Sequence, residues 1–387
     1  MRISLEQANE IVAKHTKIFE TMILPLEQCL DGILAEDVVA IMNQPPFRRS
    51  AMDGYAVRGE DIQHWLDLKT LAFQVIGEID AGDETIYHIG SKEAVRIMTG
   101  ARVPDNADFV VPQEQSDMGE DYVTFSSIPS INNIAPVGED FKAGEIIAKK
   151  GQKVDAYLLA CAAACGIKEL KIYQRPRIAI ISTGDELCLS DEPLKPGKIY
   201  DSNIVYLSSR LRQFHCNISS VEHIGDNLKN IMEGIVRAVS TADIVITTGG
   251  VSVGKKDFLE QAVLNLHGAI LFHGIDIKPG MPTMFSLVHD VPVLSLSGNP
   301  YSASAIFEWL FPFRSSIYIE ACLKRDYKKK RPCPRIVRGI YDGFSVEAVP
   351  KQQNGVMQSG IGTNCLAVFP AGEEILTAKS RVKLMLL

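Results

Sequence analysis

The feature that most constrains this chain is a regular alternation of apolar, strand-like runs with helix-like segments between residues 175 and 313. The runs are RPRIAIIST, ISSVEHI, ADIVITT and VPVLSLS, and the segments that follow them are SNIVYLSSRLRQF, NLKNIMEGIVRAV, DFLEQAVLNL and YSASAIFEWLFPF. Strands that alternate with helices in this way are typical of parallel βαβ units. Because the runs are mostly continuous in apolar residues, helices are expected to cover both faces of the sheet. The sequence therefore predicts a doubly wound α/β domain.

The chain also contains blocks of a different character, since 387 residues are more than one hydrophobic core usually serves. Residues 3–20 have helical apolar spacing with Ser4 as a candidate N-cap, and residues 152–168 predict a helix that ends at Gly166. The block between them is strand-like and rich in turn residues, as is the C-terminal tail. The predicted fold is therefore multidomain α/β plus β, with an elongated helical and linker domain at 1–43 and 141–173, an inserted β-rich domain at 44–140, the doubly wound α/β domain at 174–320 and a C-terminal β domain at 321–387.

Charge and hydropathy narrow the classes of partner. The net charge of −7 disfavours non-specific binding to nucleic acid. The basic stretch at 324–335 allows a patch for an anionic ligand, although a solvated linker is the favoured interpretation. The longest apolar stretch, residues 157–167, is too short to cross a bilayer, and the charged first ten residues do not resemble a signal peptide. We expect a cytoplasmic protein that binds neither nucleic acid nor membrane.

The eight cysteines do not form a pattern typical of a metal site. No CxxC pair occurs, and Cys161 and Cys165, which are spaced to share one face of a helix, are surrounded by alanines. A zinc site would require further His or Cys residues at short spacing. Reduced structural thiols are therefore the favoured interpretation.

The loops that follow the predicted strands carry the candidate ligand-binding residues. They are TGDEL (183–187), GDN (225–227), TGGVSVGKKD (248–257) and GNPYSAS (298–304). In an open parallel sheet, ligands bind at the carboxyl ends of the strands, and glycine-rich turns before helices present backbone N–H groups to anions. The acids in these loops, Asp185, Glu186, Asp226 and Asp257, suit a Mg²⁺ site beside a phosphate, whereas each acid taken alone could cap a helix or face solvent.

The third of these loops raises the question of an ATP-hydrolysing P-loop. Read from Gly249 it spells GxxxxGK, but Lys256 stands where a Walker A motif has the Ser or Thr that binds Mg²⁺. A Walker B pattern is also not evident. A phosphate cradle built from Gly249, Gly250 and Ser252 is therefore favoured, and a nucleotide hydrolase that uses Lys255 remains an alternative.

The motifs together resemble those of the MoeA family, which includes the E-domain of gephyrin. The α/β region contains TGDE, TGGVSVGKKD, KPG and SGNPYSA, and the inserted block contains SAMDGYAVR (50–58), RIMTGARVP (96–104) and VGED (137–140). The motifs occur in the family's order along essentially the whole chain. The resemblance implies a molybdopterin molybdenumtransferase of molybdenum-cofactor biosynthesis, which joins molybdate to adenylylated molybdopterin and releases AMP with the help of Mg²⁺. It also implies a molybdopterin-binding α/β domain and a homodimer whose active site is shared between subunits, with the molybdopterin adenylyltransferase as substrate donor.

The resemblance further implies roles for individual residues. Asp53, Thr99 and Asp140 would approach the nucleotide from the partner subunit, while Glu186 and Asp257 would hold the metal. The catalytic residues it implies are Asp53, Thr99, Asp140, Glu186, Asp226, Asp257 and Lys278, of which Lys278 would neutralise oxyanion charge. The substrate-binding residues it implies are Thr183, Gly184, Asp185, Gly249, Gly250, Ser252, Gly298, Asn299, Pro300, Ser302 and Ser359.

Four departures from the family pattern affect the expected anion site. Met281 replaces a second lysine, Ser297 replaces a proline, and the segment before VGED lacks arginines. The region after Arg338 lacks an obvious match to an arginine-containing segment of the family. A catalytically weak protein that serves as a cofactor-binding scaffold is therefore the alternative to the enzyme.

Overall fold

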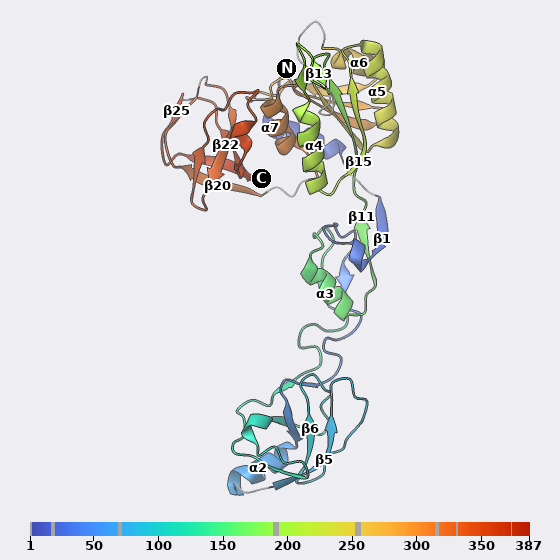
Figure 1. The fold of residues 1–387 in the computed structure, drawn as a ribbon, viewed down its shortest axis with the longest axis vertical. Helices are drawn as coiled ribbons and strands as arrows, with labels where there is room; N and C mark the ends of the chain where they lie inside the picture. The colour runs from blue at the N-terminus through green and yellow to red at the C-terminus, as the bar shows by residue number, and fades with distance from the viewer. Residues whose placement is uncertain are drawn as a thin grey trace. The chain divides into compact units, whose positions relative to one another are not determined.

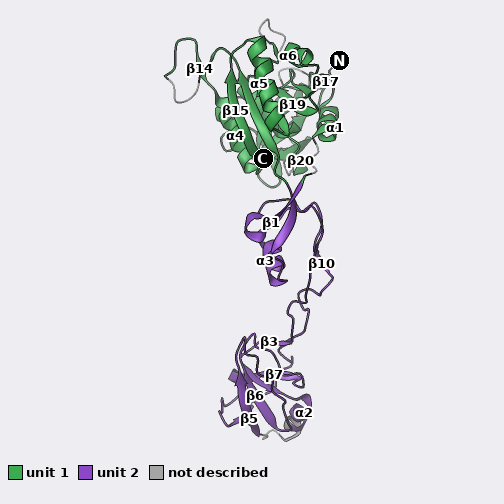
Figure 2. Cartoon of the chain, turned by 90° about the vertical axis from the view of Figure 1, so that its right-hand side faces the viewer, with its two compact units in different colours: residues 1–20, 174–387 green, residues 21–173 purple. Residues whose placement is uncertain are grey.

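The structure is a computed structural model that describes residues 2–16, 20–68, 72–188, 193–251, 257–313, 317–329, 332–372 and 374–387. The chain forms two compact units, one of residues 1–20 and 174–387 and the other of residues 21–173 (Figure 2). This division does not test the four predicted domain ranges, which stay predictions.

The larger unit contains a six-stranded sheet with the order β15-β12-β16-β19-β18-β17. Its strands are β12 (Arg177–Thr183), β15 (Asn217–Ile224), β16 (Ile244–Thr248), β17 (Ala269–His273), β18 (Met284–Val288) and β19 (Val291–Leu296). Strands β15, β12, β16 and β19 are mutually parallel, as predicted. The predicted doubly wound sheet is thus confirmed.

Two strands of this sheet, β17 and β18, were missed by the sequence analysis. Both pair antiparallel, β18 with β19 and β17 with β18. They are five residues each and are separated by the Gly- and Pro-containing loop 274–283, so their apolar residues do not form an extended run. The edge of the sheet beyond β19 is therefore mixed, and the loop between the two strands becomes part of the candidate site.

Helices cover both faces of the sheet because alternate strand residues point to opposite sides. One core contains Ile178, Ile180 and residues of the helices α1 (Leu5–His15), α4 (Ser202–Gln213) and α7 (Pro300–Leu310). The other contains Ala179, Ile181 and residues of α5 (Leu228–Thr241) and α6 (Leu259–Asn265). Figure 1 shows α5 and α6 on one side of the sheet and α4 and α7 on the other.

The predicted N-terminal helix is confirmed as α1, including its cap. The Ser4 hydroxyl accepts a hydrogen bond from the Gln7 backbone N–H, and the Gln7 side chain accepts one from the Ser4 N–H. This capping box satisfies two N–H groups that the first helical turn leaves unpaired. The helix packs on the same core as α7, and Ile3 forms a bridge with Ile275.

The C-terminal region of the larger unit is a closed five-stranded barrel with the order β20-β23-β22-β24-β26. Its strands are β20 (Tyr318–Leu323), β22 (Arg335–Tyr341), β23 (Ser345–Ala348), β24 (Cys365–Phe369) and β26 (Arg381–Leu386). The short strands β21 (Tyr327–Lys328) and β25 (Ile375–Leu376) pair beside it, and β13 (Leu187–Cys188) pairs with β14 (Ile199–Tyr200) in the α/β region.

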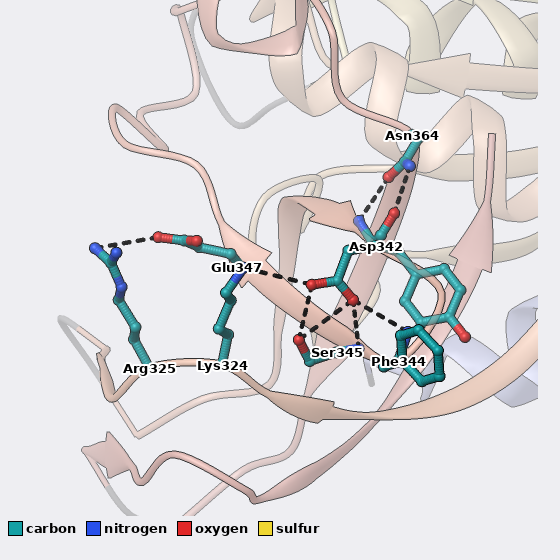
Figure 3. A network of polar contacts seen from close by, with 8 residues as sticks. Lys324, Arg325, Asp342, Phe344, Ser345, Glu347 and Asn364 are labelled. Atoms are coloured by element: carbon teal, nitrogen blue, oxygen red, sulfur yellow. Dashed lines mark hydrogen bonds and ion pairs between the residues drawn. The ribbon is translucent and has the colours of Figure 1, made fainter.

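The turn between β22 and β23 is organised by one carboxylate. Asp342 accepts hydrogen bonds from the backbone N–H groups of Phe344 and Ser345 and lies 3.4 Å from the Lys324 ammonium (Figure 3). The two backbone donors, with Ser345 first, lower the pKa of Asp342 to about 2. The carboxylate is therefore ionised near neutral pH and holds the turn in place.

The second unit contains the predicted β-rich block as a five-stranded sheet with the order β7-β4-β6-β5-β8. Its strands are β4 (Gly54–Val57), β5 (Ala72–Ile79), β6 (Glu93–Ile97), β7 (Phe109–Pro112) and β8 (Tyr122–Thr124). Helix α2 (Gly59–Leu68) follows β4 and was not predicted, although acids in its first turn favour a helix start. Three further two-stranded pairs belong to this unit. They are β1 (Thr21–Pro25) with β11 (Glu169–Tyr173), β2 (Val38–Val39) with β10 (Ile146–Ala148), and β3 (Arg49–Ser50) with β9 (Ile134–Ala135).

The predicted helix at 152–168 is shorter than expected. Helix α3 (Ala156–Ala164) begins after Asp155, whose carboxylate accepts a hydrogen bond from the Leu158 N–H, and Gly166 follows it with φ of 78°. All eight cysteines are free. None of the helices in the described part of the chain has the length and apolar content that a membrane crossing requires.

Candidate functional site

The carboxyl edge of the sheet brings several predicted residues together at a glycine turn. The Gly249 N–H donates to the Leu296 carbonyl at 3.1 Å, which joins the ends of β16 and β19. A Cβ on Gly249 would lie 2.2 Å from the Thr183 carbonyl oxygen, so the turn passes directly over the end of β12. A Cβ on Gly298 would lie 3.4 Å from the Gly249 Cα. Gly249 and Gly250 have φ of 89° and 59°, and glycine adopts such values without strain.

A buried amide that the sequence analysis missed holds this turn together. The Asn203 side-chain nitrogen donates to the Thr248 hydroxyl at 2.8 Å and to the Gly298 carbonyl at 2.9 Å. Thr248 in turn donates to the Ser297 carbonyl at 3.3 Å. The sequence shows an Asn in the first turn of the predicted helix, but it shows neither the burial of Asn203 nor its partners, which are distant in the chain. Asn203 therefore links the two glycine loops from inside the sheet edge.

The Thr183 hydroxyl lies directly under the glycine turn. It is buried and has no hydrogen-bond partner among the described residues. A Cβ placed on Gly250 would lie 2.9 Å from it. A buried hydroxyl normally finds a partner, and a ligand seated at this edge would offer one.

Two hydrogen bonds join the acidic loops after β12 and β15, each from a backbone N–H of one loop to a carboxylate of the other. The Asp185 N–H donates to the Asp226 carboxylate at 3.2 Å, and the Asp226 N–H donates to the Asp185 carboxylate at 3.0 Å. The Lys198 ammonium donates to the Asp185 carbonyl. The exposed Glu186 carboxylate lies beside Gly184, where an added Cβ would be 2.8 Å from its nearer oxygen. The structure thus brings these predicted acids to the same loop pair.

Helix capping does not explain the acids that precede α5 and α6. The N-cap of α5 is Asn227 and that of α6 is Phe258, so neither Asp226 nor Asp257 occupies a cap position. Asp257 is half-buried, whereas the predicted Ser252, together with Lys255 and Lys256, lies outside the described residues. Among the residues that the structure describes, no group of three or more His, Cys, Asp or Glu side chains is arranged to hold a metal.

Lys278 lies on the loop 274–283 at the same edge of the sheet. Strand β18 runs antiparallel to β19, and Met284 at its start pairs with Ser295 near the end of β19. The loop that precedes Met284 therefore lies at the carboxyl ends of the parallel strands. A Cβ on Gly280 would lie 2.0 Å from the Ile306 side chain, so the loop is also packed tightly against α7.

The C-terminal barrel surrounds Lys278 with further positive charge. The Lys278 N–H donates to the Pro334 carbonyl at 3.0 Å, and the Ile336 N–H donates to the Lys278 carbonyl at 2.7 Å. A cavity of about 510 Å³ is lined by Lys278, Lys328, Arg335 and Lys351, and none of its described lining residues is acidic. Lys328 and Arg335 belong to the basic stretch 324–335, for which a solvated linker was favoured over an anionic patch, and Lys351 was not singled out. Two remote segments of the chain bring these residues to Lys278.

Arg338 connects this cationic cavity to the first turn of α7. Its guanidinium carbon lies 3.6 Å from the centre of the Tyr301 ring, and its nitrogens donate to the Val356 and Lys351 carbonyls at 2.6 and 3.1 Å. The Tyr301 N–H donates to the Asn354 carbonyl at 2.8 Å. Burial lowers the pKa of Arg338, with Tyr301 opposing that shift, and no acidic side chain among the described residues pairs with it. Arg338 is therefore a buried cation that positions the loop carrying Lys351.

The remaining predicted residues of this unit lie at the start of α7 and on the barrel. Asn299 is the N-cap of α7 without a side-chain cap hydrogen bond, Pro300 is its first residue, and Ser302 is buried. An eleven-residue helix that begins at a glycine loop presents N–H groups to an anion. The Ser359 hydroxyl donates to the Lys351 carbonyl at 2.9 Å, so its role is to hold the same loop as Arg338.

Two departures from the family pattern have a structural context. Met281 lies on the loop of Lys278, where its carbonyl accepts a hydrogen bond from the Ile275 N–H at 2.9 Å. A methionine at this point removes a cation without disturbing the loop's backbone contact. The Ser297 hydroxyl accepts a hydrogen bond from the Asn299 N–H at 3.3 Å and so supports the turn before α7.

In the smaller unit, the predicted residues Asp53 and Thr99 are in direct contact. The Thr99 hydroxyl and backbone N–H donate to one oxygen of Asp53 at 2.6 and 2.7 Å. These bonds, the hydroxyl first, lower the pKa of Asp53. Thr99 also lines a cavity of about 480 Å³ with Arg49 and Glu139. The predicted Asp140 is exposed and follows Glu139 directly.

Family models match three consecutive regions of the chain. They are the MoeA N-terminal region (domains I and II) at residues 3–166, a probable molybdopterin binding domain at 179–315, and the MoeA C-terminal region (domain IV) at 320–387. The chain resembles the solved molybdopterin biosynthesis moeA protein from Pyrococcus horikoshii OT3, with a TM-score of 0.84, 26% identity and coverage of 100% of each chain.

Relatives of named activity cover most of the chain. A molybdopterin molybdenumtransferase from Haemophilus influenzae is 40% identical over 290 residues, which is 74% of this chain and 70% of that protein. A protein of the same name from Staphylococcus epidermidis is 32% identical over 399 residues, which is 99% of this chain and 95% of that protein. The three consecutive domain matches, these relatives and the shared fold lead to one conclusion: the chain belongs to the MoeA family.

Proposed function

We propose that this protein is a molybdopterin molybdenumtransferase, which inserts molybdate into adenylylated molybdopterin and releases AMP. The observation that carries the proposal is the cationic cavity around Lys278, Arg335 and Lys351, on the loops that adjoin the glycine turn of the sheet edge. Names of close relatives favour this enzyme over a cofactor-binding scaffold. The sheet edge offers a cradle for a pterin phosphate, and the cavity offers a site for a dianionic oxyanion.

The chemistry requires groups that stabilise negative charge. Molybdate has to approach a substrate that already carries phosphate groups, so cations and oriented N–H donors supply most of the stabilisation. Lys278, Arg335 and Lys351 would bind the oxyanion, with Arg338 holding the Lys351 loop in place. The turn at Gly249 and Gly298 would bind phosphate oxygens through backbone N–H groups that its glycines leave accessible.

A divalent cation, which we propose to be Mg²⁺, is compatible with the acids at this edge. Glu186 and Asp257 supply the carboxylate oxygens that Mg²⁺ prefers, and Asp226 lies on the neighbouring loop. Two carboxylates suffice, because Mg²⁺ usually retains waters and phosphate oxygens in its shell. When bound, the ion would neutralise charge on the phosphoanhydride.

We further propose that the protein acts as a homodimer in the cytoplasm. The hydrogen-bonded pair of Asp53 and Thr99, with Asp140, would approach the nucleotide bound to a second copy of the chain. The ionised Asp53 carboxylate suits a hydrogen bond to a ribose hydroxyl or a water held by the nucleotide. A molybdopterin adenylyltransferase would supply the substrate.

The proposal is tested by following AMP release from adenylylated molybdopterin with Mg²⁺, in the presence and absence of molybdate. Molybdate should stimulate AMP release, and Lys278→Ala should reduce that stimulation at least tenfold by removing a cation from the cavity. The matched control is Lys229→Ala on the exposed surface of α5, which should leave the rate unchanged. A wild-type rate that does not respond to molybdate would refute the proposed activity. Hydrolysis of free ATP would instead favour a nucleotide hydrolase.

A further inference from the structure

The end of strand β17 carries a histidine that contacts both sides of the loop following β16. The His273 Nε2 lies 3.1 Å from the Val251 carbonyl oxygen. Its Nδ1 lies 3.2 Å from a carboxylate oxygen of Glu260, in the first turn of α6. One imidazole thus joins the residue after the Gly249–Gly250 turn to the helix that follows the same loop.

The chemistry of these contacts defines the protonation state that makes both of them. A carbonyl oxygen only accepts hydrogen bonds, and so does an ionised carboxylate. Only a ring with an N–H on each nitrogen could donate to both acceptors at once. A neutral ring has one N–H and can serve only one of the two acceptors.

The position of His273 relates this contact to the whole candidate site. Gly250 and α6 are already joined by a hydrogen bond from the Leu259 N–H to the Gly250 carbonyl at 3.3 Å. His273 adds a second connection one residue further along each segment. His273 is also the last residue before the loop 274–283, which carries Lys278. The same residue thus contacts the segment after the glycine turn and directly precedes the loop of the cationic cavity in the chain.

We propose that His273 is a positioning residue for the molybdopterin cradle, which it holds in place by contacting Val251 and Glu260 at the same time. This inference rests on the proposed function. It assigns to His273 no contact with the substrate and no proton transfer. A cradle that binds the pterin phosphate equally in the ground state and the transition state changes KM and leaves kcat nearly unchanged. Loss of the His273 ring is therefore expected to raise KM.

The test compares His273→Gln, Glu260→Gln and the double variant with the wild type in steady-state kinetics. His273→Gln keeps a single donor nitrogen, which cannot reach both Val251 and Glu260, and should raise KM for adenylylated molybdopterin about tenfold because one of the two contacts is lost. Its kcat should change less than about threefold. Glu260→Gln should raise KM by a smaller factor, and the double variant should be no worse than His273→Gln alone, since both changes break one connection. The matched control, His64→Gln on the exposed surface of α2, should behave as wild type.

Hydrogen exchange of the substrate-free protein separates this proposal from the proposed activity. Backbone amides in residues 247–251 should exchange about tenfold faster in His273→Gln than in the wild type, because the loop loses a connection to α6. An unchanged exchange rate would overturn the positioning role whether or not the protein turns over the substrate. A fall in kcat with constant KM would overturn it as well, because that pattern indicates a group that acts in the chemical step. A wild type with no activity would refute only the proposed activity, and the exchange result would still decide the role of His273.

Discussion

Replacement of Gly249 by alanine is the most direct perturbation of the glycine cradle. An added Cβ would lie 2.2 Å from the Thr183 carbonyl oxygen and 2.9 Å from the Thr183 hydroxyl. The carbonyl belongs to a central strand of the sheet and cannot move aside without breaking the pairing of β12. The residue also has φ of 89°, which costs an alanine roughly 1–2 kcal/mol. Overpacking of a rigid site adds about 1–3 kcal/mol.

The two effects together predict a loss of about 3 kcal/mol in the free energy of unfolding. For a unit of this size the loss corresponds to a fall of roughly 6–12 °C in the midpoint of thermal unfolding, measured by calorimetry. Gly298→Ala is the matched control, because its Cβ would lie no closer than 3.4 Å to Gly249, and we expect its midpoint to change little. A Gly249→Ala variant that is as stable as Gly298→Ala would refute the close packing of the cradle on β12.

Three further predictions concern the charged residues. Thr99→Val removes the hydroxyl that is the largest cause of the lowered pKa of Asp53, so an NMR titration should find that pKa closer to its usual value of 3.8. Because a lowered pKa contributes stability that is lost as the pH falls through it, the variant should lose less stability in acid. Arg338→Met leaves the Val356 carbonyl without its donor and the Lys351 carbonyl with the Ser359 hydroxyl alone, and we expect a loss of about 2 kcal/mol in calorimetry together with weaker molybdate binding. Met281→Lys should lower the Kd for molybdate about fivefold in titration calorimetry, because one added, partly exposed cation contributes at most roughly 1 kcal/mol to binding. An unchanged Kd would argue against the assigned oxyanion site.

The features of the fold that could be predicted from the sequence are those with a local signal. The strand at Arg177–Thr183 and its parallel neighbours are continuous apolar runs, and the cap at Ser4 is a short motif with its own partner at Gln7. Helix α2 was missed because its neighbours are strands and its composition gives only a weak preference. Strands β17 and β18 were missed because each is short, and their pairing is set by contacts with β19 and not by their own pattern.

The same distinction applies to the candidate site. The glycine loops are contiguous motifs, so their place at the sheet edge follows from the order of strands and helices. The contacts that organise the site are not contiguous: Asn203 reaches Gly298, and Arg338 stacks on Tyr301. The sequence analysis found no obvious match to the family's arginine-containing segment after Arg338, whereas Arg338 itself is a buried cation that contacts the Lys351 loop. Such contacts depend on tertiary packing that no local pattern encodes.

The most direct test of the proposed activity is the stoichiometry between AMP release and molybdenum insertion. The protein would be incubated with adenylylated molybdopterin, molybdate and Mg²⁺, with AMP measured by chromatography and pterin-bound molybdenum measured after reconstitution of a molybdenum-free enzyme. We predict that each AMP released is matched by one molybdenum atom inserted into the pterin. Release of AMP without insertion of molybdenum would contradict the proposed function.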